Sequence, residues 1–179
     1  MQMYRNPHGV NPFFTHTQIK NISLPQMADI IIYTDGAALG NPGPGGYGAV
    51  MIYGQHRKEL SDGFVLTTNN RMELLAVIVA LKHINNPQIP ISVYTDSKYV
   101  CDAISKNWLG NWVKKGFKDV KNVDLWLEYL KVSKPFQIKF NWVKGHAGVP
   151  ENERCDFLAT QAAKNNAVNR DIEYEKIAK

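Results

Sequence analysis

Short apolar runs with β-branched residues recur along this chain, and longer stretches with helical character separate some of them. Residues 29–34 form the first run, which is rich in isoleucine and leads into an Asp-Gly pair, so it predicts a buried strand. Further strands are predicted at residues 47–53, 59–66, 91–95 and 136–143. Strands that first follow one another and then alternate with helices are typical of an α/β domain with a mixed sheet and helices on its faces.

Four stretches have the features of helices. Residues 68–84 begin with Thr and Asn, continue with a nearly unbroken apolar body and end before Pro87. The other helices are predicted at residues 97–105, 122–131 and 152–164. Two segments predict loops: GNPGPGG at residues 40–46, with four glycines and two prolines, and GHAGVPENE at residues 145–153.

Both ends of the chain lack such patterns. Residues 1–28 contain no acidic side chain and do not have the layout of a signal peptide, so we expect an extension without predicted structure, with Met27 as an alternative start. Residues 166–179 are polar and predict a tail. The expected organisation is one domain at residues 29–165 between these two segments.

Composition narrows the classes of function only slightly. No run of about 18 apolar residues occurs, so no membrane span is expected. The net charge of +5 favours a polyanionic partner without requiring one. Cys101 and Cys155 are too few for a disulfide framework, which is typical of a reducing cytoplasm. We expect a cytoplasmic monomer.

Four acidic side chains suggest chemistry at one edge of the sheet. Asp35 and Asp96 each follow a Tyr-Thr pair at the predicted end of a strand, and Glu73 and Asp156 lie near predicted helix starts. Sites in open α/β sheets form beyond the carboxyl ends of strands. Converging carboxylates repel one another unless cations neutralise them, and an all-oxygen set favours Mg²⁺, with Mn²⁺ as a substitute. On a basic protein, this combination suggests phosphodiester hydrolysis.

Each of these acids also has a structural interpretation. Asp35 begins an Asp-Gly pair, which is common in turns. Glu73 follows Asn70 by three residues, the spacing of a capping box. Asp96 can cap the next helix, and Asp156 can interact with the dipole of the last one. The functional interpretation therefore depends on all four acids meeting.

Five segments together resemble the bacterial type 1 ribonuclease H family. They are YTDGAALGNPGPGGYGAV, TTNNRMELLAV, YTDSKYV, VKNVDLW and WVKGHAGVPENERCDFLA, and they occur in the family's order within residues 29–164. The resemblance implies the ribonuclease H-like fold, a five-stranded mixed sheet with helices on both faces. It also implies an endonuclease that hydrolyses the RNA strand of RNA–DNA hybrids and leaves 3′-hydroxyl and 5′-phosphate ends.

The resemblance assigns roles to the acids and to one histidine. Asp35, Glu73, Asp96 and Asp156 match the family's metal-binding acids, which use two Mg²⁺ ions to activate a water and to stabilise the leaving 3′-oxygen. His146 matches a histidine on a mobile loop that assists proton movement and product release. Its structural interpretation is a loop histidine without a role.

Substrate recognition is implied on both strands of the hybrid. The resemblance places the backbone of Gly36 and the side chains of Asn41, Asn69, Asn70 and Glu73 along the minor groove, where the 2′-hydroxyl distinguishes RNA from DNA. Thr68 and Asn122 match a pocket that grips a phosphate of the DNA strand. Turn and cap chemistry is the structural interpretation of these residues.

A basic segment lies between the second and the third predicted helices. Residues 106–121 contain five lysines, with aromatic residues between them, and match the family's basic protrusion for the DNA strand. The implied binding residues are Trp108, Trp112, Lys114, Lys115, Lys118 and Lys121. The segment is shorter than the fullest protrusions and carries Asp119, so we expect weaker binding. A solvated loop whose aromatic residues anchor a short helix is the structural alternative.

Two other classes of function compete with this interpretation. One is a module on the same fold that binds hybrids without cleaving them, and the intact set of acids argues against it. The other is a DNA transposase or integrase, which shares the fold but lacks the TTNNRME and GHAGVPENERCD contexts. One departure from the family is Lys98, where relatives often have an uncharged polar residue, and its partner is left open.

Overall fold

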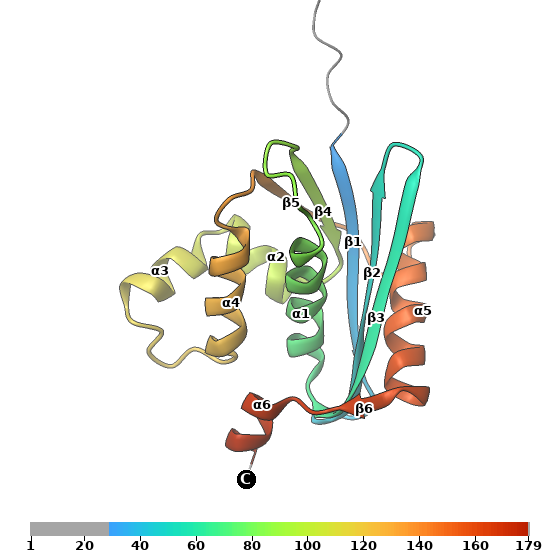
Figure 1. Cartoon of the computed structure of the whole chain (residues 1–179). Coiled ribbons are helices and arrows are strands. Elements are labelled where there is room, and N and C mark those ends of the chain that lie inside the picture. The colour runs from blue at the N-terminus through green and yellow to red at the C-terminus, as the bar shows by residue number, and fades with distance from the viewer. Residues whose placement is uncertain (1–28, 179) are drawn as a thin grey trace, which may run out of the picture.

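The computed structural model describes residues 29–178, so the predicted extension at residues 1–28 lies outside the described part. A six-stranded sheet in the order β5-β4-β1-β2-β3-β6 carries helices on both faces (Figure 1). The strands are β1 (Ile30–Ala38), β2 (Gly43–Tyr53), β3 (His56–Thr67), β4 (Ile91–Thr95), β5 (Ile138–Trp142) and β6 (Ala167–Asn169). The helices are α1 (Asn69–Lys82), α2 (Lys98–Ser105), α3 (Trp108–Lys114), α4 (Val123–Ser133), α5 (Pro150–Asn165) and α6 (Ile172–Ile177).

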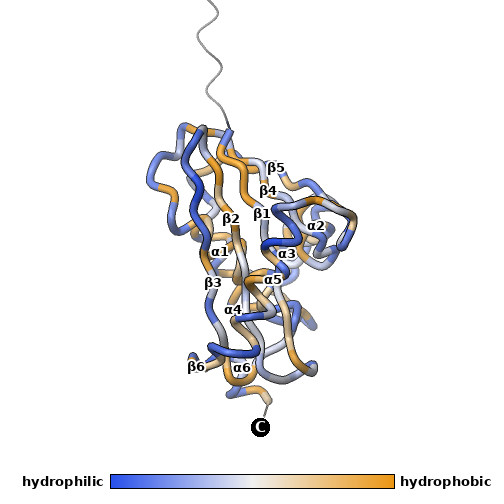
Figure 2. Tube along the Cα trace, turned by 90° about the vertical axis from the view of Figure 1, so that its right-hand side faces the viewer, coloured by the Kyte–Doolittle hydropathy of each residue, from blue (hydrophilic) through white to orange (hydrophobic). Residues whose placement is uncertain are grey.

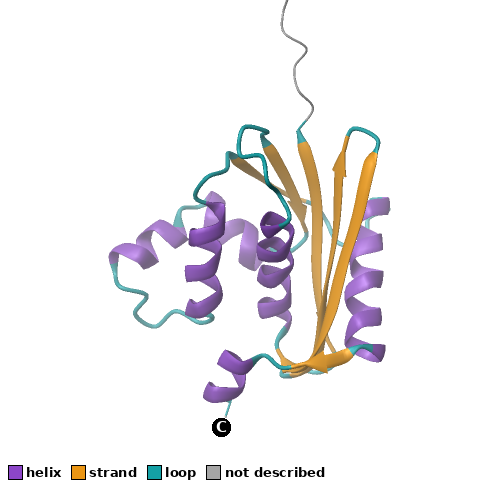
Figure 3. Cartoon of the chain, in the orientation of Figure 1, coloured by secondary structure: helices purple, strands orange, loops and turns teal. Residues whose placement is uncertain are grey.

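The sheet is mixed, as the order of its elements predicts. β1, β2 and β3 form an antiparallel meander, whereas β4 and β5 run parallel to β1 after helical connections. α5 packs on β1, β2 and β3 from one face, and α1 packs on the same strands from the other face (Figure 3). The predicted α/β fold class is confirmed, with one strand more than expected.

Helices α1, α2, α3 and α4 and the central strands enclose the main core. Ile32 of β1, Val93 of β4, Ile78 of α1 and Trp126 of α4 are fully buried in one cluster. β1 and β2 are largely hydrophobic, whereas the upper half of β3 is hydrophilic, as expected for a strand nearer the sheet edge (Figure 2). Among residues 29–178, no helix has the length and hydropathy needed to cross a bilayer.

The glycine-rich segment departs from the prediction. Residues 40–46 were expected to form a loop, but β2 already begins at Gly43. Glycines in β2 let α5 lie directly on the strand, because a Cβ at Gly48 would collide with the Cys155 carbonyl oxygen and one at Gly46 would lie 2.6 Å from the Ala159 oxygen. Residues 40–42 do form a loop, as predicted. The prediction is wrong for residues 43–46, which lie in β2, and at Gly46 it is helix packing and not a turn that requires a glycine. The second predicted loop is also shorter than expected, since α5 starts at Pro150.

The C-terminal segment is a second departure. Residues 166–179 predict a polar tail, yet residues 167–169 extend the sheet as β6, parallel to β3, and residues 172–177 form α6. Asp171 between them is buried and pairs with Arg71 of α1, whose Nε lies 2.6 Å from the Asp171 Oδ2. A buried ion pair with a partner far away in the sequence holds this segment, so its own residue pattern does not reveal it.

Candidate active site

Asp35 lies inside a strand and not in a turn. β1 continues to Ala38, and Asp35 stands opposite Gly48 of β2, so the turn interpretation is wrong. Its Oδ1 accepts a hydrogen bond from the Gly36 N–H at 2.7 Å. A Cβ at Gly36 would collide with the backbone nitrogen of Glu73, so this glycine lets α1 approach β1 beside Asp35.

Glu73 lies in the second turn of α1, and two neighbouring side chains hold its carboxylate. The helix begins at Asn69 after the N-cap Thr68, so the capping-box interpretation with Asn70 is wrong. Glu73 Oε1 accepts from Asn69 Nδ2 at 2.9 Å, and Oε2 accepts from Ser97 Oγ at 2.5 Å. The carboxylate therefore faces the start of α2, where Asp96 lies.

Asp96 follows the last residue of β4 and does not cap α2. Ser97 is the N-cap, and its Oγ accepts from the Val100 N–H at 3.2 Å. β1 and β4 pair in parallel up to Thr34 and Thr95, so Asp35 and Asp96 come next in register on adjacent strands. The sequence prediction that two strands bring two aspartates to one place agrees with this register.

Asp156 completes the cluster from the opposite face. It is the seventh residue of α5, one turn later than predicted, so the first-turn dipole interpretation applies instead to Glu151 and Glu153. Asp156 Oδ1 accepts from Thr160 Oγ1 at 3.4 Å. Its charge contributes to the raised pKa of Asp35, which places the two carboxylates within electrostatic reach.

Burial and mutual repulsion act on the cluster together. Burial, then Asp96, then Asp156 and Glu73 raise the pKa of Asp35 to about 8, against the hydrogen bond from Gly36. Burial and Asp96 raise the pKa of Glu73 to about 7, although its hydrogen bonds oppose the shift. Bound cations would relieve this repulsion, so the electrostatics suit a metal site.

The donor set also suits Mg²⁺ or Mn²⁺, because all four side chains offer carboxylate oxygens. Within residues 29–178, no three His, Cys, Asp or Glu side chains are already arranged around one point as ligands of an ion. The carboxylates bond instead to neighbours such as Ser97, Asn69 and Asn152. Cation binding would require these side chains to exchange partners.

His146 lies on the loop between β5 and α5. The loop starts beside the cluster, because a Cβ at Gly145 would lie 2.7 Å from Asp96 Oδ2. His146 is exposed and has a φ of 51°, and the Gly148 N–H donates to Glu153 Oε1 at 2.9 Å. The loop that carries the predicted histidine therefore passes beside the acid cluster at Gly145.

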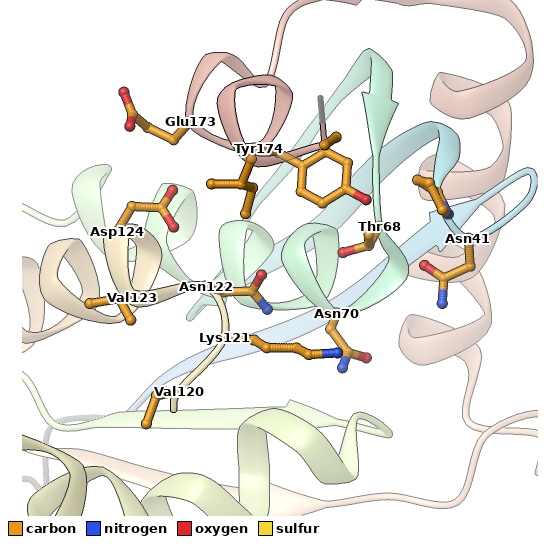
Figure 4. Close-up of a pocket in the computed structure, with 13 residues that line it drawn as sticks. Asn41, Thr68, Asn70, Val120, Lys121, Asn122, Val123, Asp124, Glu173 and Tyr174 are labelled. Atoms are coloured by element: carbon orange, nitrogen blue, oxygen red, sulfur yellow. The ribbon is translucent and has the colours of Figure 1, made fainter. Parts of the chain in front are cut away.

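The predicted groove residues form a continuous set next to the acids. Asn41 Oδ1 accepts from the Asn69 N–H at 3.3 Å, and Asn69 in turn donates to Glu73. A pocket of about 680 Å³ begins at this point (Figure 4). From the predicted substrate residues it includes Asn41, Thr68, Asn70, Lys121 and Asn122.

This pocket has the properties of an anion site. It lies between the starts of α1 and α4, and the N-terminal end of a helix carries partial positive charge. Neither N-cap residue, Thr68 or Asn122, uses its side chain as a cap, so the Thr68 hydroxyl is available to a ligand. The side chain of Lys121 adds a full positive charge.

The predicted basic residues divide into two groups. Lys121 lines the pocket, whereas Lys114, Lys115 and Lys118 are exposed at the end of α3 and on the loop after it. Of the aromatic residues, Trp112 packs edge-on against the buried Trp126 at 5.5 Å between ring centroids.

Trp108 is 41% exposed, and the Lys106 ammonium lies 5.4 Å from its ring centroid. Trp112 therefore anchors α3, as in the structural alternative, while Trp108 remains accessible to a ligand.

Lys98, whose partner the sequence leaves open, lies over an aromatic ring. Its Nζ is 5.1 Å from the centroid of Trp142, and the Trp142 indole donates to the Asp96 carbonyl oxygen at 3.0 Å. Lys98 is itself exposed. The cation–π contact places its charge near the acid cluster.

Sequence reasoning missed one residue that supports the cluster. Asn152 of α5 is 2% exposed and donates from Nδ2 to Asp96 Oδ2 at 3.1 Å. Its Oδ1 is buried without a hydrogen-bond partner among the described residues. An asparagine in the first turn of a helix carries no signal for such a role, because the contact forms only when the start of α5 lies beside the residue that follows β4.

We expect Asn152→Ala to reduce hydrolytic activity by about tenfold or more, because groups that orient ligands typically contribute that much. We also expect Mg²⁺ to raise the melting temperature of the wild type, and to raise that of Asn152→Ala by less. Asn165→Ala, at the exposed end of the same helix, is the matched control. Equal activity and equal Mg²⁺ response in both variants would contradict a positioning role.

Known proteins share this sequence and architecture. The RNase H family model matches residues 27–164. Ribonuclease H of Psychromonas ingrahamii is 54% identical over 154 residues, covering 83% of this chain and 99% of that protein. Ribonuclease H of Aeromonas hydrophila is 53% identical over 151 residues, covering 82% and 97%.

Solved structures agree with the sequence matches. LC9-RNase H1, a type 1 RNase H, superposes with a TM-score of 0.70 at 30% identity, covering 83% of this chain and 80% of that one. LC11-RNase H1, solved in complex with an RNA/DNA hybrid, gives a TM-score of 0.57 at 25% identity, covering 76% and 97%. The family match, the relatives and the fold agree, and the chain belongs to the ribonuclease H family.

Proposed function

We propose that this chain is an endoribonuclease that hydrolyses the RNA strand of RNA–DNA hybrids with two Mg²⁺ ions, leaving 3′-hydroxyl and 5′-phosphate ends. The observation that carries the proposal is the electrostatic coupling of Asp35 with Glu73, Asp96 and Asp156 at one edge of the sheet of a ribonuclease H fold. A solved relative bound to an RNA/DNA hybrid supports the choice of substrate.

The four acids would hold the ions. When bound, two Mg²⁺ ions supply an activated water and stabilisation of the leaving oxygen in an in-line displacement. The carboxylates of Asp35 in β1 and of Asp96 directly after β4 would orient the site from the sheet, while Glu73 and Asp156 approach from α1 and α5. Mn²⁺ has similar ligand preferences and is the expected substitute.

His146 is placed to move protons at the edge of the site. Its imidazole is exposed on a loop that touches Asp96 through Gly145, so it can reach a phosphate bound at the cluster or withdraw into solvent. The positive φ of Gly148 gives the loop a backbone conformation that other residues rarely adopt. This arrangement supports a role in proton transfer and product release.

Selection for RNA would occur beside the acids. Asn41, Asn69 and Glu73 form a hydrogen-bonded row that leads from the pocket to the cluster. Amide groups in such a row can both donate to and accept from a 2′-hydroxyl. The pocket at Thr68 and Asn122 would hold the DNA strand, so both strands of the hybrid would be tested.

Cleavage of labelled substrates tests the proposal directly. The chain should cleave an RNA–DNA hybrid in the presence of Mg²⁺, and should cleave neither duplex DNA nor duplex RNA at a comparable rate. Hybrid binding without cleavage would favour an inactive binding module, and cleavage of duplex DNA would favour a transposase-like activity. End-group analysis of the RNA products tests the predicted 3′-hydroxyl and 5′-phosphate.

We expect the triple change of Lys114, Lys115 and Lys118 to Ala to raise the KM for hybrids and to leave kcat nearly unchanged. These exposed side chains offer charge for phosphates and lie outside the acid cluster, so they should contribute uniform binding. Each lost phosphate contact should reduce the slope of log affinity against log salt by roughly 0.9, a value for B-DNA.

Lys131→Ala on α4 is a control for the loss of positive charge alone. An unchanged salt slope in the triple variant would favour the solvated-loop interpretation. A steep fall in kcat would instead mean that this segment positions the scissile phosphate.

A further inference from the structure

α6 forms an outer wall of the pocket that contains Thr68. Glu173 and Tyr174 of this helix line the pocket, and Tyr174 lies across it from Asn70 and Lys121 (Figure 4). The RNase H family match ends at residue 164, so it does not include this wall. The C-terminal segment therefore adds side chains to a pocket whose other lining residues lie within the matched part of the chain.

A buried arginine fixes this wall to the rest of the pocket. Arg71 is 1% exposed and donates from Nε and Nη2 to the two oxygens of Asp171, the N-cap of α6, at 2.6 and 2.8 Å. The same guanidinium donates to Asp124 at 2.9 and 2.6 Å and to Asn122 Oδ1 at 3.5 Å. One side chain thus holds α6 in place relative to the starts of α1 and α4.

Tyr174 is the polar residue of α6 that faces the pocket. The Arg71 guanidinium lies 5.7 Å from the centroid of its ring, which holds the ring by a cation–π contact. Its hydroxyl points toward Thr68 (Figure 4). Among residues 29–178, no hydrogen bond to this hydroxyl is found, so a donor is free at the pocket.

We infer that the Tyr174 hydroxyl donates a hydrogen bond to the DNA-strand phosphate held by Thr68 and Asn122, and that the C-terminal segment thereby completes the pocket. This inference rests on the proposed action on RNA–DNA hybrids. A hydroxyl aimed at an anion between two helix starts forms a charge-assisted hydrogen bond.

The acidic residue of the same wall does not oppose this contact. Glu173 points away from Thr68 (Figure 4), and its Oε1 pairs with the Lys176 ammonium at 2.5 Å. Lys121 lies on the side of the pocket that faces Tyr174 and adds positive charge there. Asp124, the other acidic residue of the lining, pairs with the buried Arg71 at 2.6 Å. Both acids of the lining are therefore paired with cations, and the charge of Lys121 favours a phosphate.

Tyr174→Phe tests the contact, because Phe keeps the ring over Arg71 and removes only the hydroxyl. The substrates are hybrids in which one DNA phosphate at a time is replaced by a neutral methylphosphonate. We expect the Kd without divalent cations and the KM with Mg²⁺ to rise roughly tenfold on intact hybrid, the size of one hydrogen bond to a charged group. kcat should be unchanged.

The position of the neutral phosphate gives the decisive readout. At one position, replacement should weaken binding by the wild type and bring wild type and Tyr174→Phe to the same Kd. When any other DNA phosphate is replaced, the difference in Kd between the wild type and Tyr174→Phe should persist. Tyr53→Phe, at the far end of β2, is the matched control and should behave as wild type throughout.

Three outcomes separate the possibilities. Normal cleavage by the wild type, with Kd and KM unchanged in Tyr174→Phe, would overturn this inference and leave the proposed function intact. A tenfold loss that persists at every phosphate position would also overturn it, because the hydroxyl would then act without a particular phosphate. A wild type that neither binds nor cleaves hybrids would overturn both proposals.

Discussion

Asp35→Asn should reduce hydrolysis of hybrids by more than about a thousandfold, as expected when one member of a catalytic unit is lost. The same change should stabilise the metal-free protein at pH 8. Burial and the neighbouring carboxylates raise the pKa of Asp35 to about 8, so the folded state prefers the protonated form. Asparagine resembles that form in shape and carries no charge.

The sign of the pH dependence follows from this shift. A carboxyl group whose pKa is raised on folding does not lower the free energy of unfolding at a pH below its ordinary pKa. As the pH rises toward the pKa of the folded state, the group lowers the free energy of unfolding more and more. We therefore expect the free energy of unfolding of Asp35→Asn to exceed that of the wild type by up to about 5 kcal/mol at pH 8, because each unit of the pKa shift corresponds to about 1.4 kcal/mol, and to be nearly equal to it at pH 4.

Thermal unfolding in a chelator at both pH values, together with cleavage assays, measures these effects. Asp119→Asn is the control, because Asp119 is exposed and its φ of 59° suits asparagine equally well. Near-native turnover in Asp35→Asn would contradict the catalytic assignment. A lower melting temperature at pH 8 would contradict the repulsion argument while leaving the catalytic role untouched.

Asp171→Asn should lower the free energy of unfolding by about 3 kcal/mol, because it leaves a buried arginine charge with one partner fewer. Asp171 accepts from Arg71 through both oxygens, and Thr67 Oγ1 donates to it at 2.7 Å. The loss should also release β6 and α6, which this residue joins to the domain.

Urea unfolding measures the stability, and hydrogen exchange of α6 amides measures its release. Glu173→Gln is the matched control, since it removes the exposed pair with Lys176 on the same helix and should cost less than about 1 kcal/mol. Equal losses in the two variants would mean that the buried pair contributes no more than a surface one.

Local patterns were sufficient for most of the elements. Residues 29–34 and 91–95 predict β1 and β4 because β-branched apolar runs bounded by turn residues identify strands without other information. α1 was predicted within two residues at its C-terminal end, since its apolar body is long. The start of β2 was missed because glycine in a strand is favourable only when a helix packs closely on it, as α5 does at Gly48.

The candidate site was predictable as a set of residues and not as an arrangement. The positions of Asp35 and Asp96 after similar strands indicated that they meet, and the parallel register of β1 and β4 agrees. The second-turn positions of Glu73 and Asp156 required the observed helix starts. Asn152 was not predictable, because its contact with Asp96 joins residues 56 positions apart.

The sequence by itself determined the acids, the order of the central strands and helices, and the family, because these depend on residue type and on local spacing. Tertiary structure decided how far the pKa values of the acids rise, since burial and repulsion appear only when α1 and α5 approach β1. It also decided that residues 167–177 belong to the domain. The Arg71–Asp171 pair spans 100 positions, and a contact at that separation leaves no periodicity in the chain.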